Sequence, residues 1–188
     1  MAGAPHRYPL LLVGLHWALA FLIIGMLASG LLMESELFTP MQTYQLIQWH
    51  KAFGVAVLLL VALRIVTRGW AMLTHRIPAL PKSFKLWEVR AAHLGHLGLY
   101  GLMLLVPVAG WLMVSASPYG LPTVLWGNVV WPHVPLVAEL KPTVYGIAHE
   151  AHELLGKALI ALLVLHVAAV VKHAYLDKIN LLTRVKPW

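Results

Sequence analysis

The chain has 188 residues, of which 60% are hydrophobic and 11% are charged. A soluble domain carries roughly a quarter charged residues, so this composition favours a protein whose apolar surface faces lipid. The net charge of +7 does not indicate nucleic-acid binding, because the basic residues flank apolar runs and form no basic helix face of their own. The absence of cysteine excludes disulfides, iron–sulfur clusters and covalently attached c-type haem.

Four apolar segments are long enough to cross a bilayer, which takes about 20 residues. In chain order they are residues 10–33, 47–66, 93–115 and 147–175. The first is too long for a cleaved signal peptide, and no small-x-small cleavage site follows it. We therefore expect an all-α fold, an integral membrane bundle of four antiparallel helices that forms one domain over residues 1–188.

The connections between these segments differ in charge. Eleven of the 14 Lys and Arg residues lie at position 7, within residues 64–90 or from residue 172 onward, whereas five of the seven acids lie towards the other side. By the positive-inside rule, both termini and the middle connection are expected to be cytoplasmic. The third connection, residues 117–144, is rich in proline and tryptophan and is expected to lie on the outer membrane surface.

Eleven histidines are many for so apolar a chain. An ionisable side chain at membrane depth indicates function by default, although any single one can equally be an interfacial residue bonded to backbone. His152 and His166 lie fourteen residues apart in the fourth segment. On a helix they share one face, about 40° apart, and are separated by about 21 Å along the axis. One face therefore offers two ligands, at two depths of the membrane.

The first two segments supply a partner for each ligand. His16 lies early in the first segment, near the cytoplasmic side, and His50 lies early in the second, near the outer side. Topology then pairs His16 with His166 and His50 with His152. Two opposed imidazoles suit a six-coordinate haem iron, whereas zinc or copper would need three or four ligands at one point. The pattern predicts two b-type haems whose iron is bound by these four histidines.

Glycine spacing is compatible with this prediction. Gly54 and Gly156 each lie four residues after a proposed outer ligand, on the same helix face. A missing side chain there would make room for a flat macrocycle. Ordinary packing of small residues between helices is the alternative.

Several residues near the cytoplasmic side have two interpretations. His173 lies seven residues beyond His166 on nearly the same face, where it can relay a proton to a reducible substrate or simply be an interfacial histidine. Arg64 can pair with haem propionates or snorkel to the interface. His93 and His96 are better suited to contacts around a haem than to binding iron, because the third segment has no matching histidine near the outer face.

Five motifs resemble the bacterial cytochrome b561 family over nearly the whole chain. The motifs are LHWALA, QWHKAFG with LRIVTR, RAAHLGHLGLY, VPVAGWLM and HELLGKALIALLVLHVAAVVKHAYLDKINLL. The resemblance implies a dihaem cytochrome of the bacterial inner membrane, with the four histidines at the family's ligand positions. It also implies a histidine of the quinone site at His173.

For stand-alone members of this size, the resemblance further implies a superoxide oxidase. In that activity superoxide gives an electron on the periplasmic side, and ubiquinone accepts it near the cytoplasmic side. The outer face has about two more acids than bases, which does not favour an anion, so Lys51 is the expected local positive entrance or else a propionate partner. The alternative function is a haem b electron-transfer and anchor subunit that links a hydrogenase or dehydrogenase partner to the quinone pool.

Overall fold

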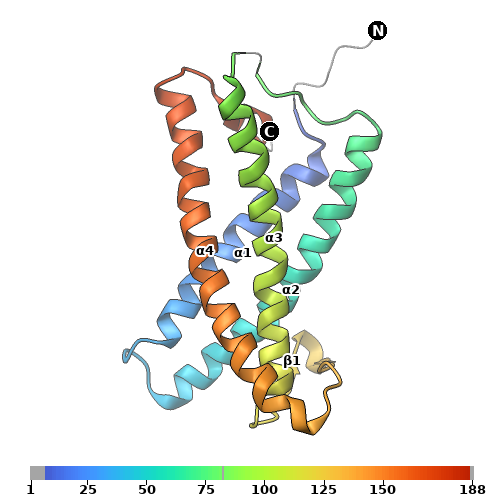
Figure 1. Cartoon of the computed structure of the whole chain (residues 1–188), viewed down its shortest axis with the longest axis vertical. Helices are drawn as coiled ribbons and strands as arrows, with labels where there is room; N and C mark the ends of the chain where they lie inside the picture. Colours follow the sequence, from blue (N-terminus) through green and yellow to red (C-terminus); the bar gives the residue numbers. More distant parts are fainter. Residues whose placement is uncertain (1–6, 82, 187–188) are drawn as a thin grey trace.

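The computed structural model describes residues 7–81 and 83–186. It has the four long helices that the sequence predicts: α1 (Leu10–Met33), α2 (Pro40–Leu73), α3 (Leu86–Ala116) and α4 (Lys141–Tyr175). Each is long and apolar enough to cross a membrane. Figure 1 shows them running up and down in turn, with α1 and α2 behind α3 and α4. The all-α membrane bundle is therefore confirmed.

Helix α1 has the expected bounds, but α2 and α3 each begin seven residues earlier than predicted. The reason is helix capping, which hydropathy does not detect. Thr39 caps α2 through a reciprocal pair of hydrogen bonds with Gln42, and the Glu88 carboxylate accepts the Lys85 N–H at the start of α3. Such caps satisfy the free N–H groups of the first turn, so the helices continue past the apolar core into the polar interface.

The bundle consists of two helical hairpins. Helix α1 packs on α2, α3 packs on α4, and the hairpins meet chiefly through α2 and α3. A small apolar cluster closes the middle of the bundle, made of Leu19, Ile23, Val57, Val61 and Leu159. Large apolar side chains such as Phe21 and Leu165 point outward and are exposed in the protein alone. Lipid is the solvent that this surface requires.

The two ends of the bundle differ, and we call them the terminal end and the ribbon end. At the terminal end, the Tyr8 N–H donates to the Arg184 carbonyl at 3.1 Å and the Trp17 indole donates to the Val185 carbonyl at 2.8 Å. At the ribbon end, β1 (Thr123–Val124) pairs antiparallel with β2 (Val130–Trp131). Short 3₁₀ turns η1 (Trp126–Asn128), η2 (Ala138–Leu140) and η3 (Leu181–Arg184) complete the described chain.

Candidate functional site

His50 on α2 and His152 on α4 face each other towards the ribbon end. Their ring centres are 6.2 Å apart and the ring planes are inclined by 80°. A metal bonds an imidazole nitrogen at about 2 Å and the ring centre lies about 1 Å farther, so two imidazoles on opposite sides of one ion have centres about 6 Å apart. The observed separation therefore matches a bis-histidine site.

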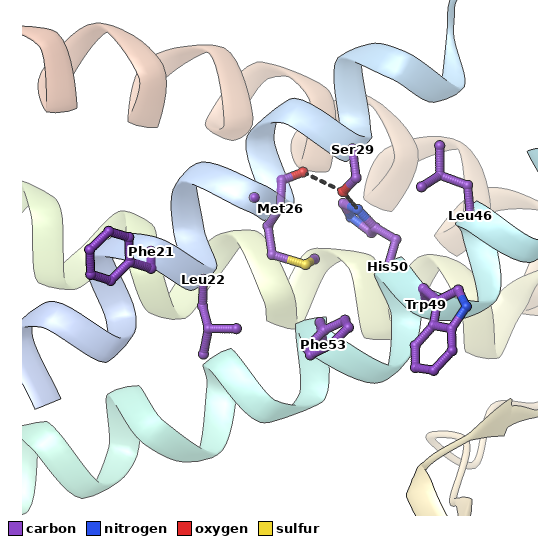
Figure 2. A pocket seen from close by; sticks show the side chains of 9 residues that line it. Phe21, Leu22, Met26, Ser29, Leu46, Trp49, His50 and Phe53 are labelled. Carbon is purple, nitrogen blue, oxygen red and sulfur yellow. Dashed lines mark hydrogen bonds between the residues drawn. The ribbon is translucent and has the colours of Figure 1, made fainter.

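Hydrogen bonds fix the tautomer of both rings. Ser29 on α1 donates its hydroxyl proton to the Met26 carbonyl at 2.9 Å, so its oxygen accepts the Nδ1–H of His50 at 2.8 Å (Figure 2). On the other side, Nδ1 of His152 donates to the Val106 carbonyl at 2.9 Å. Both rings thus keep the lone pair on Nε2 for a metal. Such outer contacts orient ligating histidines and raise their basicity.

The His152 ring packs against the stretch of α3 that contains Pro107 and Gly110. Pro107 removes the N–H that would bond the Met103 carbonyl one turn earlier, and the Val106 carbonyl that accepts from His152 directly precedes it. One turn on, a Cβ added to Gly110 would lie 3.0 Å from Cε1 of His152. Gly110 therefore gives the ring its space. The sequence does not reveal this role, because it depends on how closely α3 and α4 pack.

An apolar pocket of about 310 Å³ adjoins His50 between α1 and α2. Figure 2 shows it edged by aromatic and aliphatic side chains from both helices, including Phe21, Leu22, Met26 and Phe53. Ser29, the Trp49 indole and the His50 imidazole supply the polar side-chain atoms in its wall. Apolar walls with one fixed imidazole suit the edge of a porphyrin better than they suit a hydrated ion.

The predicted glycines divide into two cases. A Cβ on Gly54 would meet Cε of Met26 at 3.6 Å, an ordinary van der Waals distance, so Gly54 is compatible with plain helix packing. A Cβ on Gly156 would meet nothing within 4 Å. Room for a macrocycle is therefore left beside Gly156 and not beside Gly54.

Three histidines gather towards the terminal end: His16 on α1, His96 on α3 and His166 on α4. His16 interacts electrostatically with both of the others and with Arg64. The rings of His96 and His166 have centres 5.8 Å apart, again close to the separation that one metal ion would give. The structure thus brings His16 to the expected cluster, and it adds His96 as a second candidate partner for His166. His93 instead binds the Val89 carbonyl and is exposed.

Arg64 joins this cluster to the helices around it. Its Nε donates to the Tyr100 hydroxyl at 3.1 Å and its NH1 donates to the Leu12 carbonyl at 2.8 Å. The guanidinium has five N–H donors in all, so these two bonds do not exhaust it. Arg68 lies over the same Tyr100 ring, which keeps two positive charges near the three histidines.

His173 lies in an ion-paired network at the terminal end. Its Nδ1 contacts Oδ2 of Asp177 at 2.6 Å, and Phe84 stacks on its ring with centres 4.5 Å apart. The ammonium of Lys172 bridges Asp177 at 2.8 Å and Glu88 at 2.6 Å. The hydrogen bond from Lys172 holds the pKa of Asp177 below its ordinary value.

Three side chains of this network are types that can bind a metal ion, but their charge is already balanced. Ligand atoms of Glu88, His173 and Asp177 lie within 4.8 Å of one another. The ammonium of Lys172, however, already contacts both carboxylates, so their charge is balanced by the chain's own cation.

Lys51 lies beside His50 but is engaged with the ribbon. Its Nζ donates to the carbonyls of Pro122 at 2.7 Å and Leu121 at 3.4 Å. The side chain therefore fastens the connection between α3 and α4 to α2. This use of Lys51 was not foreseen, because it depends on how a long connection folds back.

Two histidine clusters at two depths, each formed between helices of an apolar bundle, define a membrane cytochrome of the b type. Known proteins agree with this class. The profile of the family Prokaryotic cytochrome b561 matches residues 7–188. The chain therefore belongs to the prokaryotic cytochrome b561 family, whose members bind b-type haem and transfer electrons.

Curated relatives cover almost the entire chain. Cytochrome b561 homolog 2 of Escherichia coli (strain K12) is 27% identical over 97% of this chain and 93% of its own length. Cytochrome b561 homolog 1 of the same organism is 27% identical over 97% of this chain and 98% of its own length. A protein of Yersinia pestis named probable superoxide oxidase CybB is 27% identical over 96% of each chain.

Proposed function

We propose that the protein carries electrons across the bacterial inner membrane through two b-type haems. The outer haem would be held by His50 and His152, and the inner one by His166 with His16. The observation that carries the proposal is the opposed pair His50 and His152, at 6.2 Å with Nε2 free on both rings. The second cluster lies about 21 Å farther along the same helix.

The ligands also limit the chemistry. When bound, each haem would supply reversible one-electron exchange at iron. With the iron held by a histidine from each of two helices, neither donor nor acceptor would reach the metal, and electron transfer would be outer-sphere. The protein's part is to hold the rings, to keep water out with apolar walls, and to place a donor and an acceptor at opposite faces.

The acceptor that this proposal assigns is ubiquinone near His173. Reduction of a quinone takes two electrons and two protons, and the proton donors must lie on the side where it occurs. The Nδ1–H of His173 is oriented by Asp177 at 2.6 Å, which leaves Nε2 to exchange protons with a bound substrate. Basic residues gather at this terminal end, which supports a cytoplasmic orientation for both termini.

Superoxide is the donor we assign, and the Yersinia pestis relative is named for that activity. The balanced reaction is two superoxide ions, one ubiquinone and two protons giving two oxygen molecules and one ubiquinol. Each superoxide gives up one electron, which suits a carrier that moves electrons singly.

A second candidate function rests on the charge of the ribbon end. Glu34, Glu36, Glu139 and Glu150 are exposed and outnumber Lys51 and Lys141 at this end, while Lys157 pairs with Glu153. An acidic surface repels an anion and attracts a positively charged protein. This observation favours the relay subunit, in which a basic donor protein would deliver electrons to the outer haem.

One experiment separates the two functions. The purified chain is mixed with superoxide and a soluble ubiquinone, and the reduction of haem and the formation of ubiquinol are measured. Superoxide oxidase activity predicts haem reduction and ubiquinol without a partner. Two stable haems that superoxide does not reduce would favour the relay, and a haem-free protein would refute both.

A further inference from the structure

Two polar nitrogens in the ribbon connection lack the partners that burial demands. They are Nε1 of Trp131 and Nε2 of His133, each buried with no hydrogen-bond partner among the residues that the structure describes. Buried polar groups are almost always paired, and an exception calls for a ligand or another explanation. Trp131 is the last residue of β2 and His133 follows it after Pro132, so both nitrogens belong to one short segment of the ribbon connection.

One edge of the ribbon is tied to the helix that carries His50. Trp131 is opposite Thr123 in the β1–β2 pair. The residues just before Thr123 offer their carbonyls to Lys51, the neighbour of His50. Phe53, one turn beyond His50, contacts the Trp126 ring at 5.2 Å.

The other edge is tied to α3 beside His152. The Trp131 ring lies 5.8 Å from the ring of Trp111, which directly follows Gly110. The Trp111 indole donates to the Pro132 carbonyl at 2.9 Å, and the Val134 N–H donates to Ser115 at 2.9 Å. The segment with the two free donors is therefore clamped to α3. It bridges from the side of His50 to the side of His152, at the ribbon end of both.

Haem b has two propionates, and their charge is costly in hydrocarbon. Propionates of a haem held by His50 and His152 would be best stabilised at the ribbon end, where the chain leaves the apolar core. Lys51, the expected partner from sequence, is already bonded to two carbonyls there. We propose that Trp131 and His133 bind the propionates of the outer haem. This proposal rests on the two-haem function above.

The test replaces each donor and measures the haem rather than turnover. Trp131→Phe and His133→Leu remove the N–H groups, and His133→Gln keeps one. Fewer donors leave the propionate charge less compensated, which stabilises ferric iron, so the midpoint potential of the outer haem should fall and that of the inner haem should not. The carboxylate bands in the infrared difference spectrum should shift as well.

Matched controls come from the same end of the protein. Tyr119→Phe changes an exposed tyrosine of the connection between α3 and α4, and His149→Leu changes an exposed histidine of α4. Both should keep the wild-type potentials and infrared bands. The midpoint potential of the outer haem in His133→Gln should lie close to that of wild type, because the amide N–H replaces the donor that His133→Leu removes.

The outcomes distinguish the two proposals. His152→Ala first identifies the outer haem in the otherwise unchanged protein; if no haem is lost, the two-haem function itself is wrong. If the outer haem is present and Trp131→Phe and His133→Leu match their controls in potential and infrared bands, the propionate assignment is overturned. If Trp131→Phe does not fold, as loss of both haems would show, the His133→Leu and His133→Gln pair decides.

Discussion

Replacing Gly110 by alanine should weaken the outer haem site. The added Cβ would lie 3.0 Å from Cε1 and 3.1 Å from Nδ1 of His152, whereas carbon atoms in contact prefer about 3.5 Å or more. The ring would have to retreat by about 0.5 Å, which strains its 2.9 Å hydrogen bond to Val106 and moves Nε2. Loss of such a contact costs about 10- to 100-fold in metal affinity, or about 1.4–2.8 kcal/mol.

The assay is haem content by optical spectroscopy, with the two haems resolved by redox titration. We expect Gly110→Ala to lose much of the outer haem and to retain the inner one. Gly101→Ala on the same helix is the matched control, because its Cβ would meet nothing within 4 Å. Gly98→Ala would press on the flexible end of Leu162 at 2.9 Å and tests the same kind of packing change nearer the terminal end, where it should leave the outer haem in place. A Gly110→Ala protein with both haems and unchanged potentials would refute the reasoning.

Three further predictions concern other contacts. Ser29→Ala removes the acceptor for the Nδ1–H of His50 and should weaken outer haem binding about tenfold or more. Ser35→Ala, just beyond the end of α1, is the control, and equal haem content in the two variants would count against the prediction. His173→Ala should slow ubiquinone reduction by about 100-fold or more with both haem spectra intact, and a wild-type rate would exclude His173 from proton transfer. The bond from Lys172 depresses the pKa of Asp177, so this carboxylate stabilises the fold above about pH 4, the ordinary value, and the contribution is lost as pH falls through the folded pKa. Asp177→Asn should therefore unfold at a lower temperature than wild type from about pH 5 to 8 and converge with it only in acid. Convergence near neutral pH would contradict this.

The sequence predicts those features that follow from helix periodicity and membrane topology. Four apolar segments predict the bundle, and the fourteen-residue spacing of His152 and His166 predicts two levels on one helix. His50 lies beside His152 because antiparallel helices bring the start of α2 and the start of α4 to the same end. These relations need no knowledge of how the side chains pack.

Features that depend on the rotation and approach of the helices were not predictable. His96 meets His166 because of the angle at which α3 lies against α4, whereas its sequence position indicated only that it is near the cytoplasmic side. The role of Gly110 requires the His152 ring to pack closely against the backbone of α3. The bond between Glu88 and Lys172 joins residues 84 apart in the chain, and only tertiary structure brings them together.

Haem content and redox titration of two variants test the central claim most directly. His152→Ala and His166→Ala are purified beside the wild-type protein, and each haem is counted and assigned its potential. The account predicts two haems in the wild type, and loss of a different one in each variant: the outer haem without His152 and the inner haem without His166. Loss of the same haem in both variants, or a wild type with a single haem, would contradict it.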